Sequence, residues 1–301
     1  MTRRQWLRMA AAQMASPVES ILVHEHVLVD FAGADVAGPD RYDAEEVFRT
    51  ALPKLREVRA LGCVRLQECT PAFLGRAPAL LRRLSEAAEL DIWTNTGLYA
   101  AREHKHLPRY AFDEPAPRLA RRWVNEAARG VEGVRPRFIK IGVNRHPLPE
   151  VDRKIVLAAA MTSSHTGLTI ASHTGDGRAA GEQLEILASA GVAPGKFVWV
   201  HAQNEREKRY HEQIARAGGW VEFDGVGPKS APWHRECVTH MAAQGLLGRV
   251  LISQDSGWYR VGEPGGGAYR GYTSLYTDFL PLLDPAWRQV LLWENPRAAF
   301  G

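Results

Sequence analysis

Six side chains of the kinds that bind metal ions stand at the ends of apolar, strand-like runs in this 301-residue chain. They are His24, His26, Lys140, His173, His201 and Asp255. Histidine and carboxylate groups are the usual nitrogen and oxygen ligands of zinc-like ions. A polar group at the end of a buried strand costs free energy unless it is paired or binds something. We therefore expect these side chains to meet in one metal site.

The first two of these residues form a His-x-His pair. His24 and His26 are two positions apart in a strand-like run, so their side chains share one face. In a barrel strand that face can be the interior, where both rings reach one ion. The alternative is a pair of satisfied core or surface histidines. A second His-x-His, His104 and His106, lies in a polar, arginine-flanked stretch, and we expect it at the surface or in a substrate loop.

The remaining candidates are weaker when each is taken alone. Lys140 ends the run 137–139. An unpaired ammonium is costly to bury, so this lysine either extends to solvent at the barrel mouth or is carbamylated by CO2 into an anionic ligand. His173 and His201 each end a predicted strand, and Asp255 either ligates metal or caps a turn.

The elements that must position these residues alternate along the chain. Predicted strands cover 21–31, 63–69, 91–97, 137–143, 168–173, 197–201, 220–224 and 250–253. Predicted helices cover 44–60, 77–90, 117–130, 150–164, 177–190, 206–217 and 233–244. Asp43 precedes two glutamates, as at a helix start, and Gly191 indicates a helix end. Eight strands separated by helices predict one (β/α)8 barrel domain over 21–301.

Composition excludes several other classes of protein. A charged fraction of 24% with 45% hydrophobic residues argues against disorder. The net charge of +4 comes without a nucleic-acid-binding module, and Arg118, Arg121, Arg122 and Arg129 are expected on the solvated face of one helix. We expect no nucleic-acid partner and no membrane span. The three cysteines are too few for a disulfide framework, and Cys63 and Cys69 are expected in the core.

The N-terminal segment, residues 1–20, allows two interpretations. Residues 2–7 resemble a twin-arginine export signal, and an apolar run follows over 9–15. That run is short, is interrupted by Gln13, and has no clear cleavage site after it. The alternative is a basic helical turn before the first strand. A periplasmic and a cytoplasmic location therefore both stay open.

An ordered set of short motifs along the chain resembles the amidohydrolase superfamily and, within it, the phosphotriesterase-related family. The motifs lie at 24–30, 70–76, 96–99, 138–142, 173–175, 182–184, 201, 255–258 and 294–297. A single His-x-His is unspecific, but this ordered set is specific. The chain departs from the family at Gln254, in the turn after His201, and in its short lead-in before His24.

The resemblance implies a distorted barrel with a binuclear metal centre. His24 and His26 would hold the more buried ion with Asp255, while His173 and His201 would hold the more exposed one. Carbamylated Lys140 and a water-derived hydroxide would bridge the two ions. Zinc is the expected metal, with cobalt or manganese able to substitute, and a homodimer is expected on the same ground. Asp255 would take the proton from the hydroxide during attack.

The substrate expected from these residues is a small ester-like molecule. Tyr99 stands where lactone-hydrolysing relatives tend to carry tyrosine, although an aromatic cover of the barrel core is an equal alternative. Trp258 and Arg260 are expected to contact the substrate with Tyr99, and they lead into a glycine-rich stretch that could cover the barrel mouth. We expect a hydrolase of lactones or carboxylic esters with phosphotriesters as a side activity. A phosphodiesterase, an amidase or a catalytically silent binding barrel are the alternatives.

Overall fold

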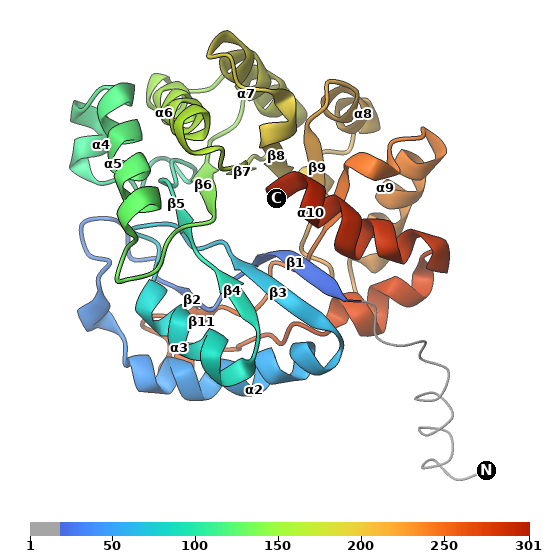
Figure 1. Cartoon of the computed structure of the whole chain (residues 1–301), viewed down its shortest axis with the longest axis horizontal. Helices are drawn as coiled ribbons and strands as arrows, with labels where there is room; N and C mark the ends of the chain where they lie inside the picture. The colour runs from blue at the N-terminus through green and yellow to red at the C-terminus, as the bar shows by residue number, and fades with distance from the viewer. Residues whose placement is uncertain (1–18) are drawn as a thin grey trace.

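The computed structural model describes residues 19–301, which form a closed ring of parallel strands surrounded by helices (Figure 1). The strands are β1 (Ser20–Glu25), β2 (Leu28–Val29), β3 (Cys63–Glu68), β4 (Asp91–Trp93), β5 (Asn95–Thr96), β6 (Phe138–Gly142), β7 (Ile170–His173), β8 (Phe197–Val200), β9 (Trp220–Phe223), β10 (Val250–Ile252) and β11 (Tyr259–Arg260). The ring runs β1-β3-β4 and then β5-β6-β7-β8-β9-β10. It closes where the Asp255 N–H donates to the His24 carbonyl over 3.0 Å. The predicted (β/α)8 barrel is confirmed.

The helices of the described chain cover the outside of this ring. They are α2 (Ala44–Ala60), α3 (Pro78–Ala88), α4 (Arg109–Asp113), α5 (Ala116–Arg129), α6 (Glu150–Thr166), α7 (Gly177–Ser189), α8 (Lys208–Arg216), α9 (Ala231–Ala243) and α10 (Asn295–Phe300), with π-helical turns at Leu275–Phe279 and Val290–Glu294. Seven of them match predicted helices to within about three residues at each end, as boundaries usually do. Asp43 caps α2, because its carboxylate accepts from the Glu45 N–H over 2.8 Å. The two short helices α4 and α10 were not predicted.

The first predicted strand, 21–31, is wrong as a single element. It breaks after Glu25, and residues 28–29 pair instead with Tyr259 and Arg260 of β11. The Glu25 carbonyl still accepts from the Cys69 N–H over 2.8 Å, but the next N–H on the β3 side, that of Val27, donates to the Glu68 carboxylate over 3.1 Å instead of to the β3 backbone. This departure is the distortion of the barrel, and it turns the His26 side chain toward the barrel mouth.

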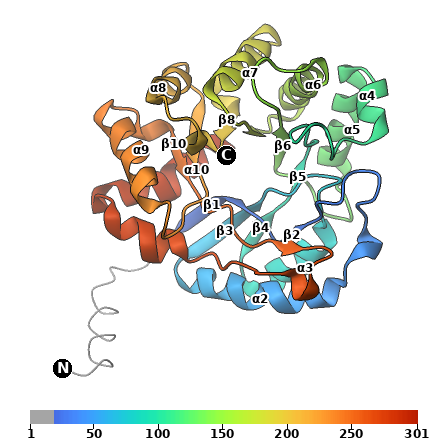
Figure 2. The ribbon, with the colours of Figure 1, turned by 180° about the vertical axis from the view of Figure 1, so that it is seen from behind.

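The C-terminal helix closes one end of the barrel. In Figure 1 α10 lies in front of the barrel centre, and Figure 2 views the opposite end. The ring of Phe300 lies 5.9 Å from that of Phe138, the first residue of β6. The Thr169 hydroxyl donates to the Ala299 carbonyl over 2.6 Å. The amino ends of the strands are therefore covered, which leaves the carboxyl ends as the open face.

Two apolar layers hold the barrel together. The interior layer includes Val23, Phe138, Val198 and Trp220, and the outer layer packs strands against helices. Cys63 and Cys69 are buried, as predicted, and so is Cys237. None of the helices formed by residues 19–301 combines the length and the apolar character that crossing a bilayer requires. The twin-arginine-like segment and the rest of residues 1–18 lie outside the described residues.

Candidate metal centre

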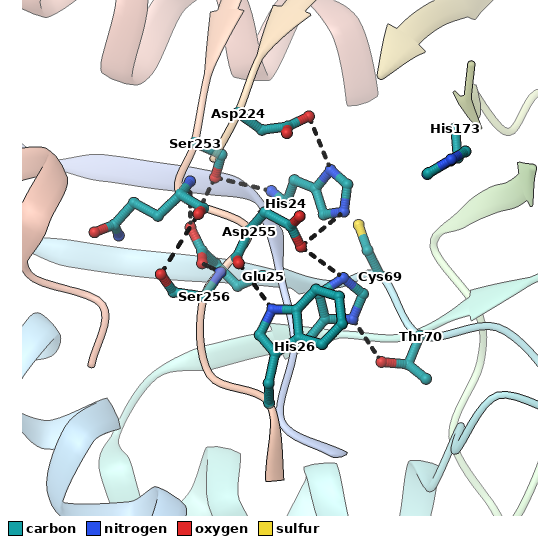
Figure 3. Close-up of polar contacts among 12 residues, drawn as sticks. His24, Glu25, His26, Cys69, Thr70, His173, Asp224, Ser253, Asp255 and Ser256 are labelled. Atoms are coloured by element: carbon teal, nitrogen blue, oxygen red, sulfur yellow. Dashed lines mark hydrogen bonds and ion pairs between the residues drawn. The ribbon is translucent and has the colours of Figure 1, made fainter. Parts of the chain in front are cut away.

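The carboxyl ends of β1 and β10 bring two histidines and an aspartate together (Figure 3). The two segments are clamped by the backbone hydrogen bonds that join Asp255 to His24 and His26 to Ser256. The Nε2 atom of His26 lies 3.1 Å from Asp255 Oδ1, and that of His24 lies 3.7 Å from the same oxygen. These three side chains form one group with the spacing of metal ligands.

Hydrogen bonds on the far side of each ring set the tautomers of these histidines. The Nδ1 atom of His24 lies 2.8 Å from Glu222 Oε1, and burial lowers the pKa of His24 to about 4. The Nδ1 atom of His26 lies 2.7 Å from the Thr70 hydroxyl, which donates to Glu68 over 2.6 Å. Asp224, an ionised carboxylate whose Oδ2 lies 3.4 Å from His24 Nδ1, and a hydroxyl whose proton is already donated can only accept. Both rings therefore carry their proton on Nδ1, and both Nε2 lone pairs face Asp255.

This donor set fits a cation. Asp255 Oδ1 makes no hydrogen bond within residues 19–301, although it is enclosed by the two imidazoles. An aspartate of ordinary pKa is ionised at neutral pH, so the group is a carboxylate. Three lone-pair donors that converge without a proton between them repel one another. A divalent ion is the partner that such a set of nitrogen and oxygen donors suits.

A further imidazole joins the group from the end of β8. His201 has a positive φ of 65°, which turns its ring to within 5.0 Å of the ring of His24. Its N–H donates to Asp224 Oδ2 over 2.9 Å, and its Nδ1 contacts the other oxygen of the same carboxylate. The Nε2 atom of His201 is thereby left available as a ligand. Burial raises the pKa of Asp224, but contact with His201 and His24 outweighs it and holds that pKa well below the usual range.

The remaining predicted ligands come from the neighbouring strands β6 and β7. The His173 ring lies 4.4 Å from that of His201, and the Tyr99 hydroxyl lies 3.2 Å from His173 Nε2. Burial lowers the pKa of His173 well below its usual value, which favours the neutral ring. Lys140 is only 2% exposed and lines the same pocket. In Figure 3 His173 lies apart from the three-residue group at the end of β1.

A buried glutamate fixes the segment that carries Asp255. The carboxylate of Glu25 accepts from the Ser253 hydroxyl over 2.9 Å and from the N–H groups of Gln254 and Ser256 over 3.0 and 2.8 Å. Asp255 lies between these donors with a φ of 50°. A non-glycine residue adopts that conformation only where the surroundings hold it. Glu25 thus orients the carboxylate that faces the two histidines.

The six predicted ligands line one pocket of about 270 Å³ at the open end of the barrel. The pocket is lined by His24, His26, Val29, Phe31, Cys69, Pro71, Leu74, Tyr99, Arg102, Lys140, His173, His201, Gln203, Asn204, Asp224, Gly225, Asp255 and Trp258. Of the predicted substrate contacts, Tyr99 and Trp258 are in this lining. Arg260 is not, and its guanidinium lies 3.4 Å from Glu263 Oε1 instead. The arginine at the pocket is Arg102.

The second His-x-His is not a surface pair. His106 is 1% exposed, and its ring lies 5.9 Å from that of Tyr99. His104 Nε2 lies 2.6 Å from the buried Asp152. Of the two expectations, the surface role is wrong, because a polar, arginine-flanked sequence does not reveal a buried acid on α6; the substrate-loop role stays a prediction.

Sequence reasoning also missed the acidic residues of β9 and its end. Glu222 and Asp224 are both fully buried, and they hold the Nδ1 sides of His24 and His201. The sequence did contain a signal for them. Successive side chains of a strand point to opposite faces, so Trp220 and Glu222 share the face toward the barrel interior. A carboxylate in the interior of a buried strand needs a partner, and these two contact histidines of the candidate metal site.

A parallel α/β barrel with histidines and carboxylates at the carboxyl ends of its strands has the architecture of a barrel enzyme. A profile of the Phosphotriesterase family matches residues 11–300, and the chain belongs to that family, which is part of the amidohydrolase superfamily. It is 24% identical over 280 residues to the aryldialkylphosphatase of Saccharolobus solfataricus, covering 91% of this chain and 85% of the relative. It is 25% identical over 295 residues to the phosphotriesterase homology protein of Escherichia coli, covering 94% and 98%.

A solved structure supports the fold. A mutant of an organophosphorus hydrolase from Deinococcus radiodurans superposes with a TM-score of 0.84 at 25% identity, covering 97% of this chain and 94% of that one. Other relatives are named for different reactions. The N-acetyltaurine hydrolase of Homo sapiens is 26% identical over 79% of this chain and 73% of its own, and the phospho-furanose lactonase of Mycoplasmopsis synoviae is 28% identical over 48% and 44%. The named reactions are hydrolyses of several bond types.

Proposed function

We propose that this protein is a binuclear metal-dependent hydrolase of a small ester-like substrate. A carboxylic ester or lactone is favoured, with phosphotriesters as a side activity. The observation that carries the proposal is the convergence of two imidazole Nε2 atoms on the otherwise unbonded Oδ1 of Asp255, at the floor of a substrate-sized pocket. Perturbed carboxylates and histidines gathered in one pocket are typical of active sites.

The ligands of the two ions follow from the strand ends. We assign His24, His26 and Asp255 to one ion and His173 and His201 to the other, with Lys140, as a carbamate, between them. Carbamylation fits the position of Lys140, because no carboxylate lies within 4 Å of its amine in residues 19–301, whereas an anionic oxygen there would face both groups of histidines. Zinc suits these donors, and cobalt or manganese would substitute.

The chain's own groups divide the work of hydrolysis. Two divalent ions, when bound, supply a water of lowered pKa and polarise the substrate oxygen. Asp255 receives the proton of the attacking water, since its carboxylate lies at the floor of the pocket with one oxygen free of hydrogen bonds within residues 19–301. Tyr99 and Trp258 form apolar walls that orient the acyl group, and the Tyr99 hydroxyl beside His173 can donate to the leaving oxygen.

Two alternatives use the same centre. The human relative is named as an N-acetyltaurine hydrolase, so an amidase remains a second candidate. A phosphodiesterase would need the same ions and a differently shaped pocket. A silent binding barrel is opposed by the complete donor set, because a protein without metal chemistry has no need to enclose an unbonded carboxylate oxygen. The homodimer and both interpretations of the N-terminus stay predictions.

The test combines metal content with a substrate panel. The protein is stripped with a chelator, reloaded with zinc, cobalt or manganese, and assayed on a lactone, an aryl ester, a phosphotriester, a phosphodiester and an acyl amide. We expect two ions per chain and turnover of ester or lactone that is lost on stripping. Asp255→Asn should lower kcat by at least about a hundredfold. Asp113→Asn, at a surface pair with Arg109, is the matched control and should have no effect.

Different outcomes separate the candidates. Turnover of the amide or the phosphodiester alone would replace the favoured substrate class. Full activity after metal stripping, or in Asp255→Asn, would remove the proposal as a whole. Mass spectrometry of native and acid-treated protein tests Lys140, because a carbamate adds the mass of CO2 and is released in acid.

A further inference from the structure

A strained turn lies beside the pocket in the segment after Tyr99. Arg102, Glu103 and His104 are three consecutive non-glycine residues in the left-handed region, with φ values of 58°, 54° and 67°. Each is energetically unfavourable for an L-residue, and runs of them are rare. Such a turn persists only where the surrounding structure holds it, and it is often found at functional sites. The hydrogen bonds that hold this turn therefore indicate which of its side chains is directed into the pocket.

One side of the turn is braced by the end of strand β6 and by helix α6. The Glu103 N–H donates to Asn144 Oδ1 over 3.1 Å, and the Asn144 amide donates to the Ala100 carbonyl over 2.9 Å. The fully buried Asp152 lies 2.6 Å from His104 Nε2 and accepts from the Asn144 side chain over 3.0 Å. The polar pair formed by Asn144 and Asp152 thus directs most of its hydrogen bonds to this turn.

The other side is braced by the loop after β2. The Lys105 amine donates to the Phe31 carbonyl over 2.7 Å, and the Lys105 carbonyl accepts from the Ala34 N–H over 3.0 Å. Residue Gly33 approaches so closely that a Cβ there would lie 3.2 Å from the Lys105 carbonyl oxygen. The turn is therefore fixed from two independent directions. A surface loop without a function would not need this bracing.

The turn presents one charged side chain to the pocket. The Arg102 guanidinium carbon lies 5.2 Å from the centre of the Phe31 ring, and both residues line the pocket. Arg102 forms no ion pair with any carboxylate of residues 19–301, whereas Arg109, seven residues on, pairs with Asp113. The acidic groups of the pocket, Asp224 and Asp255, are held by histidines at its floor. Within the part of the chain that the structure describes, Arg102 is thus a cation at the pocket without a carboxylate partner.

We propose that Arg102 binds a fixed negative charge on the substrate, so that the natural substrate is a small anionic ester, lactone or amide. This inference rests on the proposed hydrolase function and names the substrate class for it. A planar guanidinium matches a carboxylate, sulfonate or phosphate through paired hydrogen bonds. Phe31 beneath it restricts the orientations of the guanidinium. Arg102 determines specificity, while the reacting atoms lie at the floor of the pocket.

The experiment compares esters of one chain length that differ in charge, with the kcat/KM of the diester halved because it carries two equivalent ester groups. Monomethyl glutarate and dimethyl glutarate carry the same methyl ester on the same chain, and methyl 4-sulfobutanoate replaces the carboxylate by a sulfonate. Methanol release by the metal-loaded protein gives kcat and KM for each. Wild type should favour both anionic esters over the neutral one. Arg102→Gln should lower kcat/KM for the anionic esters about 10- to 100-fold, chiefly through KM, and change the neutral ester less than about twofold.

Three further variants separate recognition from a structural effect. Arg102→Lys keeps the positive charge but lacks the paired donors of the guanidinium, so it should retain part of the preference for the anionic esters. Asn144→Ala loosens the turn and should reduce the preference in the same direction. Arg109→Gln removes an arginine outside the pocket and should leave every rate unchanged.

The two hypotheses fail in different ways. Equal kcat/KM for charged and neutral esters in wild type, or an equal loss for both in Arg102→Gln, overturns the role of Arg102 and leaves the hydrolase standing. If no ester is hydrolysed, calorimetry of the same holoprotein with monomethyl and dimethyl glutarate decides the matter. Tighter binding of the monoester that Arg102→Gln abolishes supports anion recognition even then. Equal binding of both esters overturns it.

Discussion

Glu222 offers the sharpest test of how the barrel holds its candidate metal ligands. The carboxylate is fully buried in β9, and its hydrogen bond to the site joins Oε1 to His24 Nδ1 over 2.8 Å. Its second oxygen has no partner within residues 19–301. Burial first, and Asp224 next, raise the pKa of Glu222 well above its usual value, so the fold gains little from this group. Its contribution should therefore appear in metal binding rather than in folding.

The size of the effect follows from what remains when Glu222 is replaced. In Glu222→Leu the nearest acceptor for the His24 N–H is Asp224 Oδ2 at 3.4 Å, which is long for a hydrogen bond. Loss of such a second partner usually weakens metal binding by about 10- to 100-fold, or about 1.4–2.7 kcal/mol. Glu222→Gln keeps a carbonyl acceptor and should lose about tenfold or less. Stability of the metal-free protein should stay equal or rise in Glu222→Leu, because an apolar side chain replaces a buried acid.

The assay is competition between the protein and a chromophoric chelator for zinc, with chemical denaturation of the metal-free protein alongside. Glu212→Gln is a matched control. Glu212 Oε1 lies 2.9 Å from His240 Nε2, and Glu212 does not line the pocket. It should leave the zinc affinity unchanged. If Glu222→Leu folds normally and keeps its zinc affinity within about twofold of wild type, Glu222 does not position His24. Parallel losses of affinity and stability would also refute the reasoning, because they indicate a structural role.

Three further outcomes are expected. Gly257→Ala should cost at least about 2–3 kcal/mol and disrupt the site, because φ is 95° and the new Cβ would overlap the His26 carbonyl oxygen. Gly262 has a φ of 90° with open space around it, so Gly262→Ala should lower the free energy of unfolding by only about 1 kcal/mol. Equal losses for the two glycine variants in urea unfolding would contradict this. Burial lowers the pKa of His211 from 6.5 to about 4, so the unfolded chain takes up a proton that the folded one rejects. The free energy of unfolding should therefore fall as the pH drops from about 6.5 to 4, and it should fall by up to about 3 kcal/mol more in wild type than in His211→Gln. Identical pH profiles of the two proteins would exclude this role of His211. Saturating zinc should raise the unfolding free energy by about 2.7 kcal/mol at a hundredfold excess over Kd, and no shift in Tm on chelation would argue against a bound ion.

The ring of elements was accessible from the sequence because each signal is local. Apolar runs of strand length alternate with helix-period stretches, and helix α2 matches its predicted bounds, with Asp43 as its cap. Strand β3 likewise begins at the predicted residue and ends within one residue of it. The predicted ligands were accessible for a related reason. Side chains that follow parallel strands of one barrel meet at its carboxyl end, whatever their separation in sequence.

The break after Glu25 could not be predicted in the same way. Residues 21–31 have the pattern of one strand, and the ladder with β3 ends only because the Val27 N–H donates to the side chain of Glu68, 41 positions away. The assignment of Arg260 to the pocket shows the same limit. The Arg260 side chain points to Glu263. The arginine of the pocket is Arg102, in a left-handed turn that is held by hydrogen bonds to Asn144.

Residue type and strand periodicity are properties of short segments, so the sequence alone indicated which residues could bind metal and that they stand at the ends of strands of one barrel. Tertiary structure alone decided which nitrogen of each histidine faces the site. That choice depends on Glu222, Thr70 and Asp224, acceptors supplied by other strands or the segments that follow them. A proton stays on the ring nitrogen that finds an acceptor, and only the closed barrel brings acceptor and ring within hydrogen-bond distance.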